Sequence, residues 1–210
     1  MRPSGVTDLE SLVDRARALA GRGGRRLLGI TGPPGSGKST LAERMVAALG
    51  DTARLVDMDG FHLAQEELRR LGREERKGAP DTFDAHGYLE LLARLRARPA
   101  HTVYVPRFCR RLEEPIAAAV AVEPHVPLVV TEGNYLLVPE EPWRGLRALL
   151  DEVWYCELDD DIRRRRLYAR HLAYGKTVEQ ARRWAYERDE ANARLVARTR
   201  SSADLVVRMS

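Results

Sequence analysis

The chain has 210 residues, of which 44% are apolar and 31% charged, a composition typical of a globular protein in water. This length suits one substantial core and is short for two, so we expect a single domain over residues 1–210. The 35 basic and 31 acidic residues are mostly interleaved and leave a net charge of +4, which argues against a nucleic-acid partner. No apolar run approaches the roughly 18 residues that span a membrane, and the amino terminus has no apolar signal segment, so we expect a cytoplasmic protein without a membrane partner. The two cysteines, Cys109 and Cys156, allow neither a disulfide framework nor a paired metal site.

Apolar periodicity predicts helices that alternate with short buried strands along the whole chain. Besides the helix that begins near Lys38, the expected helices cover residues 8–20, 85–97, 143–150, 159–172 and 177–200. The expected strands of the main sheet cover residues 26–31, 53–58, 127–133, 152–158 and 204–207. This alternation predicts a three-layer α/β fold, with a mostly parallel sheet and helices on both of its faces. Two further extended segments, 102–106 and 116–122, are expected to pair as a hairpin outside that sheet.

The segment from Gly32 to Ser39 fits the P-loop pattern G-x-x-x-x-G-K-[ST], and it lies between an expected strand and an expected helix. Gly35 and Gly37 permit the positive φ angles that turn backbone N–H groups inward, and the helix N-terminus adds its own N–H groups, so the loop can cradle phosphates. Lys38 is expected to reach the β- and γ-phosphates, and the Ser39 hydroxyl to ligate Mg²⁺. The pattern predicts a nucleoside triphosphate bound by Gly32, Pro33, Pro34, Gly35, Ser36, Gly37, Lys38, Ser39 and Thr40.

Acidic residues lie at the ends of two further strands that are expected to be parallel. Asp57 and Asp59 end the strand at 53–58, and Glu132 ends the strand at 127–133. Because ligands of open α/β sheets bind beyond the carboxyl ends of the strands, all three carboxylates are expected near the P-loop. We expect Asp59 to accept the proton of a substrate hydroxyl, and Asp57 or Glu132 to hold Mg²⁺ directly or through water. The alternative is that Asp59 has only a structural role in a turn, since Asp-Gly is a strong turn pair.

A dense group of charges begins at Asp159 and continues along the next expected helix. Arg163, Arg166 and Arg170 are three and four positions apart, so they share one face of that helix. Together with the helix that follows, the segment at about 159–180 is expected to form a lid over the phosphates. Arg166 and Arg170 are then catalytic candidates that neutralise charge on the transferred group. The alternative is a solvated helix face with acidic residues at its start and basic residues later.

Two polar loops that carry aromatic side chains, 77–84 and 106–111, lie in an expected acceptor-side insert at about 72–122. Charged groups beside an aromatic ring suit the recognition of a small acceptor, although ordinary surface loops have a similar composition. His62 and His86 are expected to be structural rather than catalytic, because a carboxylate already supplies a base. The candidate acceptor-binding residues are Asp59, Phe61, His62, Lys77, Phe83, Arg107, Glu132 and Tyr135.

These motifs together resemble the phosphoribulokinase/uridine kinase family of P-loop kinases, and most of all its nucleoside/nucleotide kinase or fructokinase-like branch. The resemblance spans about residues 26–207, and it rests on four motifs in order, with the arginine-bearing helix after them: Gly29 to Thr40, Asp57 to His62, Lys77 to Asp84 and Thr131 to Leu137. It implies that Asp59 is the catalytic base, that Glu132 is the acidic residue near the metal, and that Arg166 and Arg170 are the arginines of the lid. Related kinases place an aromatic and basic segment against the acceptor where this chain has Arg107 to Arg110, often with an aspartate at the position of Cys109.

The implied activity is the Mg²⁺-dependent transfer of the γ-phosphate of ATP to a hydroxyl of a small molecule, such as a nucleoside, a sugar or a vitamin-like compound. The open alternative is a nucleotide-binding regulatory ATPase without a small-molecule acceptor. A GTPase is disfavoured, because the D-x-x-G match at Asp57 follows the P-loop too closely and no Asn-Lys-x-Asp is present. The identity of the acceptor, the choice of ATP over GTP and the oligomeric state stay open, with a homodimer as one option.

Overall fold

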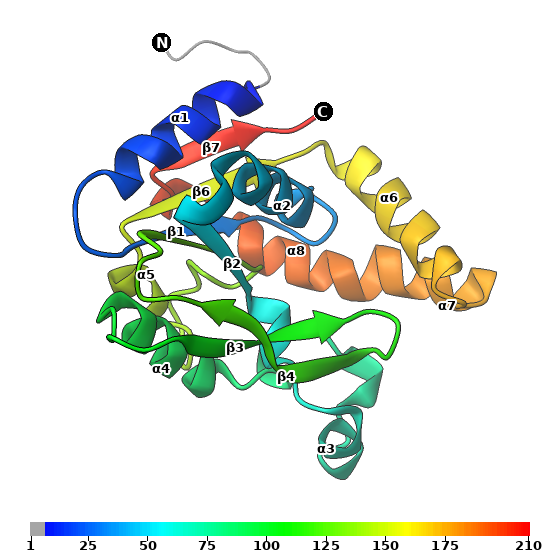
Figure 1. Ribbon diagram of the computed structural model, residues 1–210. Helices are drawn as coiled ribbons and strands as arrows, with labels where there is room; N and C mark the ends of the chain where they lie inside the picture. The colour runs from blue at the N-terminus through cyan, green and yellow to red at the C-terminus, as the bar shows by residue number, and fades with distance from the viewer. Residues whose placement is uncertain (1–6) are drawn as a thin grey trace.

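The computed structural model describes residues 7–210 and contains a five-stranded parallel sheet (Figure 1). Its strands are β1 (Arg26–Thr31), β2 (Ala53–Asp57), β5 (Leu128–Glu132), β6 (Glu152–Glu157) and β7 (Leu205–Arg208). They lie in the order β2-β5-β1-β6-β7, so β1 is central and β5 separates it from β2. Each predicted strand is present within one or two residues of its expected bounds.

Helices cover both faces of the sheet, because apolar side chains alternate between the two sides of each strand. On one face, Leu28 and Ile30 of β1 pack in a cluster with α1 (Leu9–Ala20) and α2 (Lys38–Leu49). On the other face, Leu27 belongs to a cluster with α4 (Ala85–Arg96), α5 (Leu146–Leu149) and α8 (Asp189–Ala197). The predicted three-layer α/β fold is therefore confirmed.

A two-stranded antiparallel hairpin stands outside the main sheet, as predicted. It consists of β3 (Val103–Cys109) and β4 (Glu114–Val122), and its register shifts between Val105 and Arg107. The short helix α3 (Gln65–Arg70) lies earlier in the same insert. The hairpin packs closely on the turn that follows β2: a Cβ atom on Gly60 would lie 2.8 Å from the Pro106 carbonyl oxygen. The hairpin and the end of β2 are thus in direct backbone contact.

A helical arm leads away from the edge of the sheet and returns to it (Figure 1). It comprises α6 (Asp160–Ala173), α7 (Val178–Arg183), a π-helical turn at Trp184–Arg188, and α8. Side chains cap two of these helices: Asp159 accepts from the backbone of α6, and Thr177 forms a capping box with Gln180 at the start of α7. The single helix predicted over 177–200 is wrong, because the π turn interrupts it and its last segment ends at Ala197.

The two cysteines lie in different sheets, one in a core strand and one in the hairpin. Cys156 is fully buried in β6 as a small core residue, and Cys109 is half-buried in β3. None of the helices formed by residues 7–210 is both long enough and apolar enough to cross a membrane.

Candidate active site

The P-loop connects the central strand to α2 at the carboxyl edge of the sheet. Gly35 and Gly37 have φ angles of +79° and +91°, the left-handed conformations that the motif predicts. Gly32 allows a close approach of two backbones, because a Cβ atom there would lie 2.7 Å from the Cys156 carbonyl oxygen. The helix begins at Lys38. The loop therefore ends at a helix N-terminus, which is an anion-binding arrangement.

Glu132 lies beside the P-loop, because β5 is hydrogen-bonded to β1 and also to β2. Its register partners are Ile30 on one side and Asp57 on the other. The Ser39 hydroxyl donates to Glu132 Oε1 at 2.8 Å. Only 5% of Glu132 is exposed, and this burial raises the pKa of its carboxyl group despite the opposing charge of Lys38.

Asp57 adds a second carboxylate to this buried, oxygen-rich region. Its Oδ1 accepts from the Gly60 amide at 2.6 Å. Burial, together with the charges of Asp59 and Glu132, raises the pKa of Asp57 to about 7. Hard divalent cations prefer oxygen ligands, so the Ser39 hydroxyl and these carboxylates are chemically suited to Mg²⁺. A cation here would also relieve the repulsion between carboxylates, and the predicted metal residues therefore fit that ion.

Asp59 lies in the short turn after β2, with 27% of its side chain exposed. Its Oδ2 accepts from Arg110 Nη2 at 3.1 Å. Burial is the largest influence and would raise the pKa of Asp59, but His62, Arg110 and two more distant cations outweigh it, so the pKa is lowered. The carboxylate is therefore ionised at neutral pH, as a base must be before it can accept a proton.

His62 supports this turn instead of offering a second base. Its Nδ1 lies 2.9 Å from the Asp59 carbonyl oxygen, and burial lowers the pKa of its imidazole. The ring is 4.0 Å from that of Phe83 and 4.9 Å from that of Phe108. An isolated antiparallel bridge joins the backbones of His62 and Phe83. The residue thus connects the Asp59 turn to the loop at 77–84.

A cavity of about 410 Å³ opens between the P-loop, the Asp59 turn, the β3–β4 hairpin and the helical arm. Of the residues predicted to bind nucleotide, metal or acceptor, those that line it are Pro34, Gly35, Lys38, Ser39, Asp59, His62, Lys77, Phe83 and Arg170. The structure therefore brings together predicted residues from four separate parts of the chain. The volume is adequate for a small organic acceptor.

Four predicted acceptor-binding residues do not line this cavity. Glu132 is buried at the end of β5, where it accepts from Ser39. Phe61 packs on the core, with its ring 5.1 Å from that of Tyr88. Tyr135 is fully buried and donates to the Gly78 carbonyl oxygen, so it supports the loop from beneath. Arg107 is exposed. Phe61, Tyr135 and Arg107 shape the site only indirectly.

The cavity also has lining residues that the sequence analysis did not name individually as site residues. Phe108 of β3 and Arg110, which directly follows that strand, belong to the predicted acceptor loop at 106–111, and both line the cavity. From the helical arm and the segment after β5 come Asn134, His171, Lys176, Trp184, Asp189 and Asn192. His171 Nε2 lies 2.8 Å from Asp189 Oδ2 and so links α6 to α8. The π turn at Trp184–Arg188 could have pointed to these residues, because such turns often mark functional sites. Apolar periodicity in the sequence does not reveal a π turn, however.

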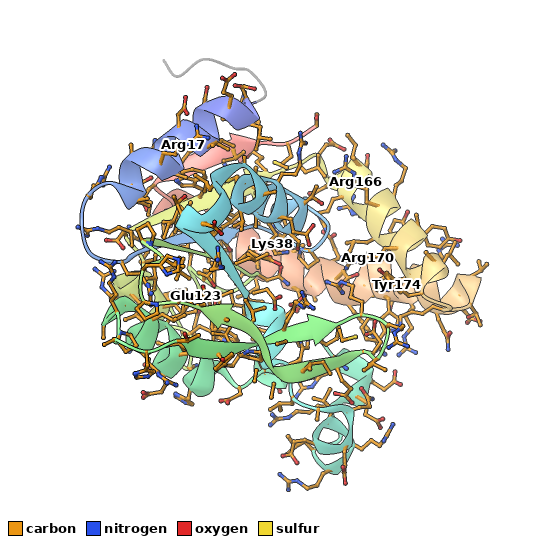
Figure 2. All side chains as sticks on the ribbon, viewed as in Figure 1. Arg17, Lys38, Glu123, Arg166, Arg170 and Tyr174 are labelled. Carbon is orange, nitrogen blue, oxygen red and sulfur yellow. The ribbon has the colours of Figure 1, made fainter. Side chains whose placement is uncertain are left out.

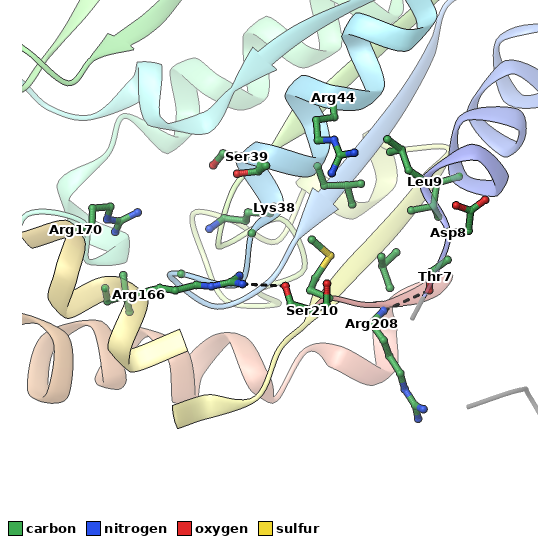
Figure 3. A pocket seen from close by; sticks show the side chains of 18 of the residues that line it. Thr7, Asp8, Leu9, Lys38, Ser39, Arg44, Arg166, Arg170, Arg208 and Ser210 are labelled. Atoms are coloured by element: carbon green, nitrogen blue, oxygen red, sulfur yellow. Dashed lines mark hydrogen bonds between the residues drawn. The ribbon is translucent and has the colours of Figure 1, made fainter. Parts of the chain in front are cut away.

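A second cavity, of about 750 Å³, lies on the other side of the P-loop (Figure 3). It is lined by Thr40 and Arg44 of α2, by Arg166 and Arg170 of α6, and by the segment after β7. Arg166 Nη2 donates to the Ser210 carbonyl oxygen at 2.9 Å. The two cavities share the P-loop, because Gly35, Lys38, Ser39 and Arg170 line both of them.

Arg166 and Arg170 lie along α6, with Lys38 nearer the centre of the molecule (Figure 2). Arg163, which the spacing places on the same face, is instead completely buried. It forms ion pairs with Asp160 and Glu190 and donates to the Pro34 carbonyl oxygen at 3.4 Å. Arg163 therefore fastens the start of α6 to the P-loop and to α8, and it does not reach the cavity.

Residues 27–191 match the family model described as an AAA domain. The chain belongs to this family. The chain is similar to a candidate uridine kinase of Schizosaccharomyces pombe, with 32% identity over 213 residues that cover 96% of this chain and 91% of that protein. The crystal structure of a candidate fructose transport system kinase from Silicibacter sp. has a TM-score of 0.86 and 38% identity, covering 95% of this chain and 98% of that one.

A third similar protein shares the fold with this chain but has low sequence identity to it. The structure of YFH7 from Saccharomyces cerevisiae has a TM-score of 0.81 and 20% identity, covering 97% of this chain and 99% of that one. The resemblance to uridine kinase-like P-loop kinases is thus confirmed. This AAA domain is a P-loop protein of the kinase type, for which the family implies ATP as the nucleotide and a small molecule as the acceptor.

Proposed function

We propose that the chain transfers the γ-phosphate of ATP to a hydroxyl group of a small molecule. The observation that carries this proposal is the junction of the two cavities, where Lys38, Ser39 and Arg170 line both. One cavity suits a nucleotide whose phosphates lie on the P-loop. The other suits an acceptor, and it contains the ionised carboxylate of Asp59. A phosphoryl group at the junction would be accessible from both sides.

The residues around the junction have distinct tasks in this proposal. The P-loop amides and Lys38 hold the phosphates, and Arg170 offsets the negative charge on the transferred group. The acceptor oxygen bonds to the γ-phosphorus as the bond to the β–γ bridging oxygen breaks, so that ADP leaves. Asp59 takes the proton that the hydroxyl releases. Each of these steps uses a side chain that lines the acceptor cavity.

Ser39, Glu132 and Asp57 would hold Mg²⁺ directly or through water. When bound, the ion neutralises phosphate charge and orients the γ-phosphate. Within residues 7–210 no three His, Cys, Asp or Glu side chains cluster as a metal site of their own. Oxygen atoms of the nucleotide would therefore have to complete the coordination, which is the usual arrangement for Mg²⁺ in kinases.

The segment at about 159–180, which comprises α6 and the start of α7, would act as a lid on the junction. Arg166 and Arg170 both face cavities there, while Arg163 anchors the first turn. Closure of such a segment excludes water, so that the phosphoryl group reaches the acceptor and not the solvent. Arg166 would exchange its contact with Ser210 for one with the nucleotide.

The test is ADP formation in the presence and absence of added alcohols, with nucleosides, sugars and vitamins as a panel. A kinase releases ADP in an acceptor-dependent way, whereas a regulatory ATPase releases it without an acceptor. Asp59→Asn should lower turnover by roughly 10²–10⁴-fold with little loss of ATP binding. The matched control is Asp51→Asn, since the Asp51 side chain is 96% exposed in the turn that precedes β2, at the opposite end of that strand from Asp59. Equal loss of turnover and ATP binding in Asp59→Asn would make that aspartate structural and would refute the assignment.

A further inference from the structure

Of the 35 basic residues of the chain only three are lysines, namely Lys38, Lys77 and Lys176. All three line the acceptor cavity. Lys38 belongs to the P-loop motif, but the motif does not account for the other two. All the remaining residues of the 35 are arginines, so lysine occurs in this chain only around one cavity.

Lys77 and Lys176 come to this cavity from two different segments, the loop at 77–84 and the helical arm, and each lies against an aromatic ring. Lys77 Nζ is 5.4 Å from the centre of the Phe108 ring, and Lys176 Nζ is 4.5 Å from that of Trp184. Lys77 also donates to the side chain of Gln65 at 3.3 Å. Burial lowers the pKa of Lys77, and the charge of Lys176 acts in the same direction against Glu113 and Glu114, so the two ammonium groups are close enough to repel each other.

Four of the cavity's carboxylates have arginine or histidine partners, and a fifth, Glu113, contributes its backbone carbonyl oxygen as an acceptor for Lys77. Asp59 pairs with Arg110, and Asp189 pairs with His171. Glu74 pairs with Arg69, and Glu75 pairs with Arg188. Across residues 7–210 no carboxylate lies within ion-pairing distance of Lys77 or Lys176. The nearest carboxylates, Glu113 and Glu114 for Lys77 and Glu75 for Lys176, act only from beyond that distance. Two partly buried ammonium groups thus face one cavity without a direct ion pair, and an anionic ligand would stabilise their charge.

We infer that the acceptor carries an anionic group, a phosphomonoester or a carboxylate, which Lys77 and Lys176 bind while its hydroxyl lies near Asp59. This inference rests on the proposed function, since it names the class of acceptor for the same site. A lysine ammonium is a compact, strongly hydrated point charge with three donors, so it can approach one oxygen from either segment. The aromatic rings beside it limit the water that would otherwise compete for those donors.

Labelling of amines gives a direct test that needs no turnover. The protein with ADP and Mg²⁺ is treated with trace acetic anhydride, and the acetylation of each lysine is measured by mass spectrometry. ADP should protect Lys38. Ribose 5-phosphate or glycerate should then protect Lys77 and Lys176, whereas ribose and glycerol, which lack the anionic group, should not. The two anionic probes separate a phosphomonoester site from a carboxylate site.

Failure of ADP to protect Lys38 would count against the proposed nucleotide site and not against the anion site. Absence of protection at Lys77 and Lys176 by both anionic probes, or equal protection by the neutral compounds, would overturn the inference.

A second test uses an acceptor that the protein phosphorylates. Lys77→Gln and Lys176→Gln should each raise the KM for this acceptor by about 10- to 100-fold with little change in kcat. Lys77→Arg should retain part of the affinity, and Arg182→Gln on the exposed side of α7 should leave KM unchanged. A neutral acceptor whose KM is the same in all four variants would also refute the anion site.

Discussion

Arg110 Nη2 lies 3.1 Å from Asp59 Oδ2, so a hairpin 51 positions further along the chain holds the carboxylate that we assign as the base. The contact fixes the orientation of the carboxylate and favours its ionised form. Arg110 also lines both cavities. The arginine can therefore adjust the acidity of Asp59 in response to either ligand.

The first prediction concerns the pH dependence of activity in Arg110→Gln. Burial raises the pKa of Asp59 and the surrounding cations lower it, so removal of one cation should raise that pKa. A base is lost as the pH falls through its pKa, and the acid limb of kcat/KM should therefore move to higher pH. Profiles of kcat/KM against pH for both proteins measure the shift. Arg111→Gln, at the exposed neighbour, should keep the original profile.

The second prediction concerns the Mg²⁺ requirement of Glu132→Gln. This variant preserves the size of the side chain and its ability to accept from Ser39, but it removes a buried negative charge beside the P-loop. The Mg²⁺ concentration for half-maximal activity should rise by about 10- to 100-fold. A titration of Mg²⁺ at saturating ATP measures it, with exposed Glu140→Gln as the control. An unchanged requirement would mean that Glu132 does not help to hold the ion.

The third prediction concerns the stability of Arg163→Ala. Deleting this buried guanidinium leaves Glu190 with only Arg164 and leaves the Pro34 carbonyl oxygen without its donor. Loss of one partner of a buried ion pair should lower the free energy of unfolding by about 3 kcal/mol. Urea denaturation measures the loss. Arg165→Ala, which changes an exposed neighbour on α6, should alter it by less than about 0.5 kcal/mol.

The fourth prediction concerns Gly60→Ala, which adds a methyl group where the Asp59 turn meets the hairpin. The new Cβ atom would lie 2.8 Å from the Pro106 carbonyl oxygen, and backbone atoms cannot move aside as a flexible side chain can. The free energy of unfolding should fall by about 1–3 kcal/mol. The hairpin that carries Arg110 should also be displaced, so the acid limb should shift as in Arg110→Gln. Gly21→Ala, with nearest contacts at 3.6 Å, should fold with wild-type stability.

The sheet, the P-loop and the neighbouring carboxylates could be predicted because local patterns determine them. Continuous apolar runs marked the buried strands, and the glycines of the P-loop required the conformations that the structure shows. Once the strands are parallel, Glu132 and the P-loop must lie at the same edge of the sheet. The Ser39–Glu132 contact at 2.8 Å follows from that topology.

The acceptor side was harder to predict, because it depends on contacts between distant segments. The register of the hairpin shifts between Val105 and Arg107, so the sequence could not show which residues of the predicted loop at 106–111 meet the cavity. Arg107 was named individually, whereas Phe108 and Arg110 are the residues that line it. Helical spacing put Arg163 on the face of Arg166 and Arg170, but it could not reveal that Glu190 covers the first turn. The site formed by the helical arm depends in the same way on a π turn that has no periodic signature.

The backbone bridge between His62 and Phe83 joins the turn of Asp59, the proposed base, to the loop at 77–84, the proposed acceptor-binding loop. A substitution that reshapes this loop for a new compound would also move Asp59, because the bridge and the stacked rings transmit the displacement. Efforts to redirect the enzyme to other acceptors should therefore vary both segments together. Variant libraries confined to positions 77–84 should yield proteins with altered acceptor binding but a lower kcat.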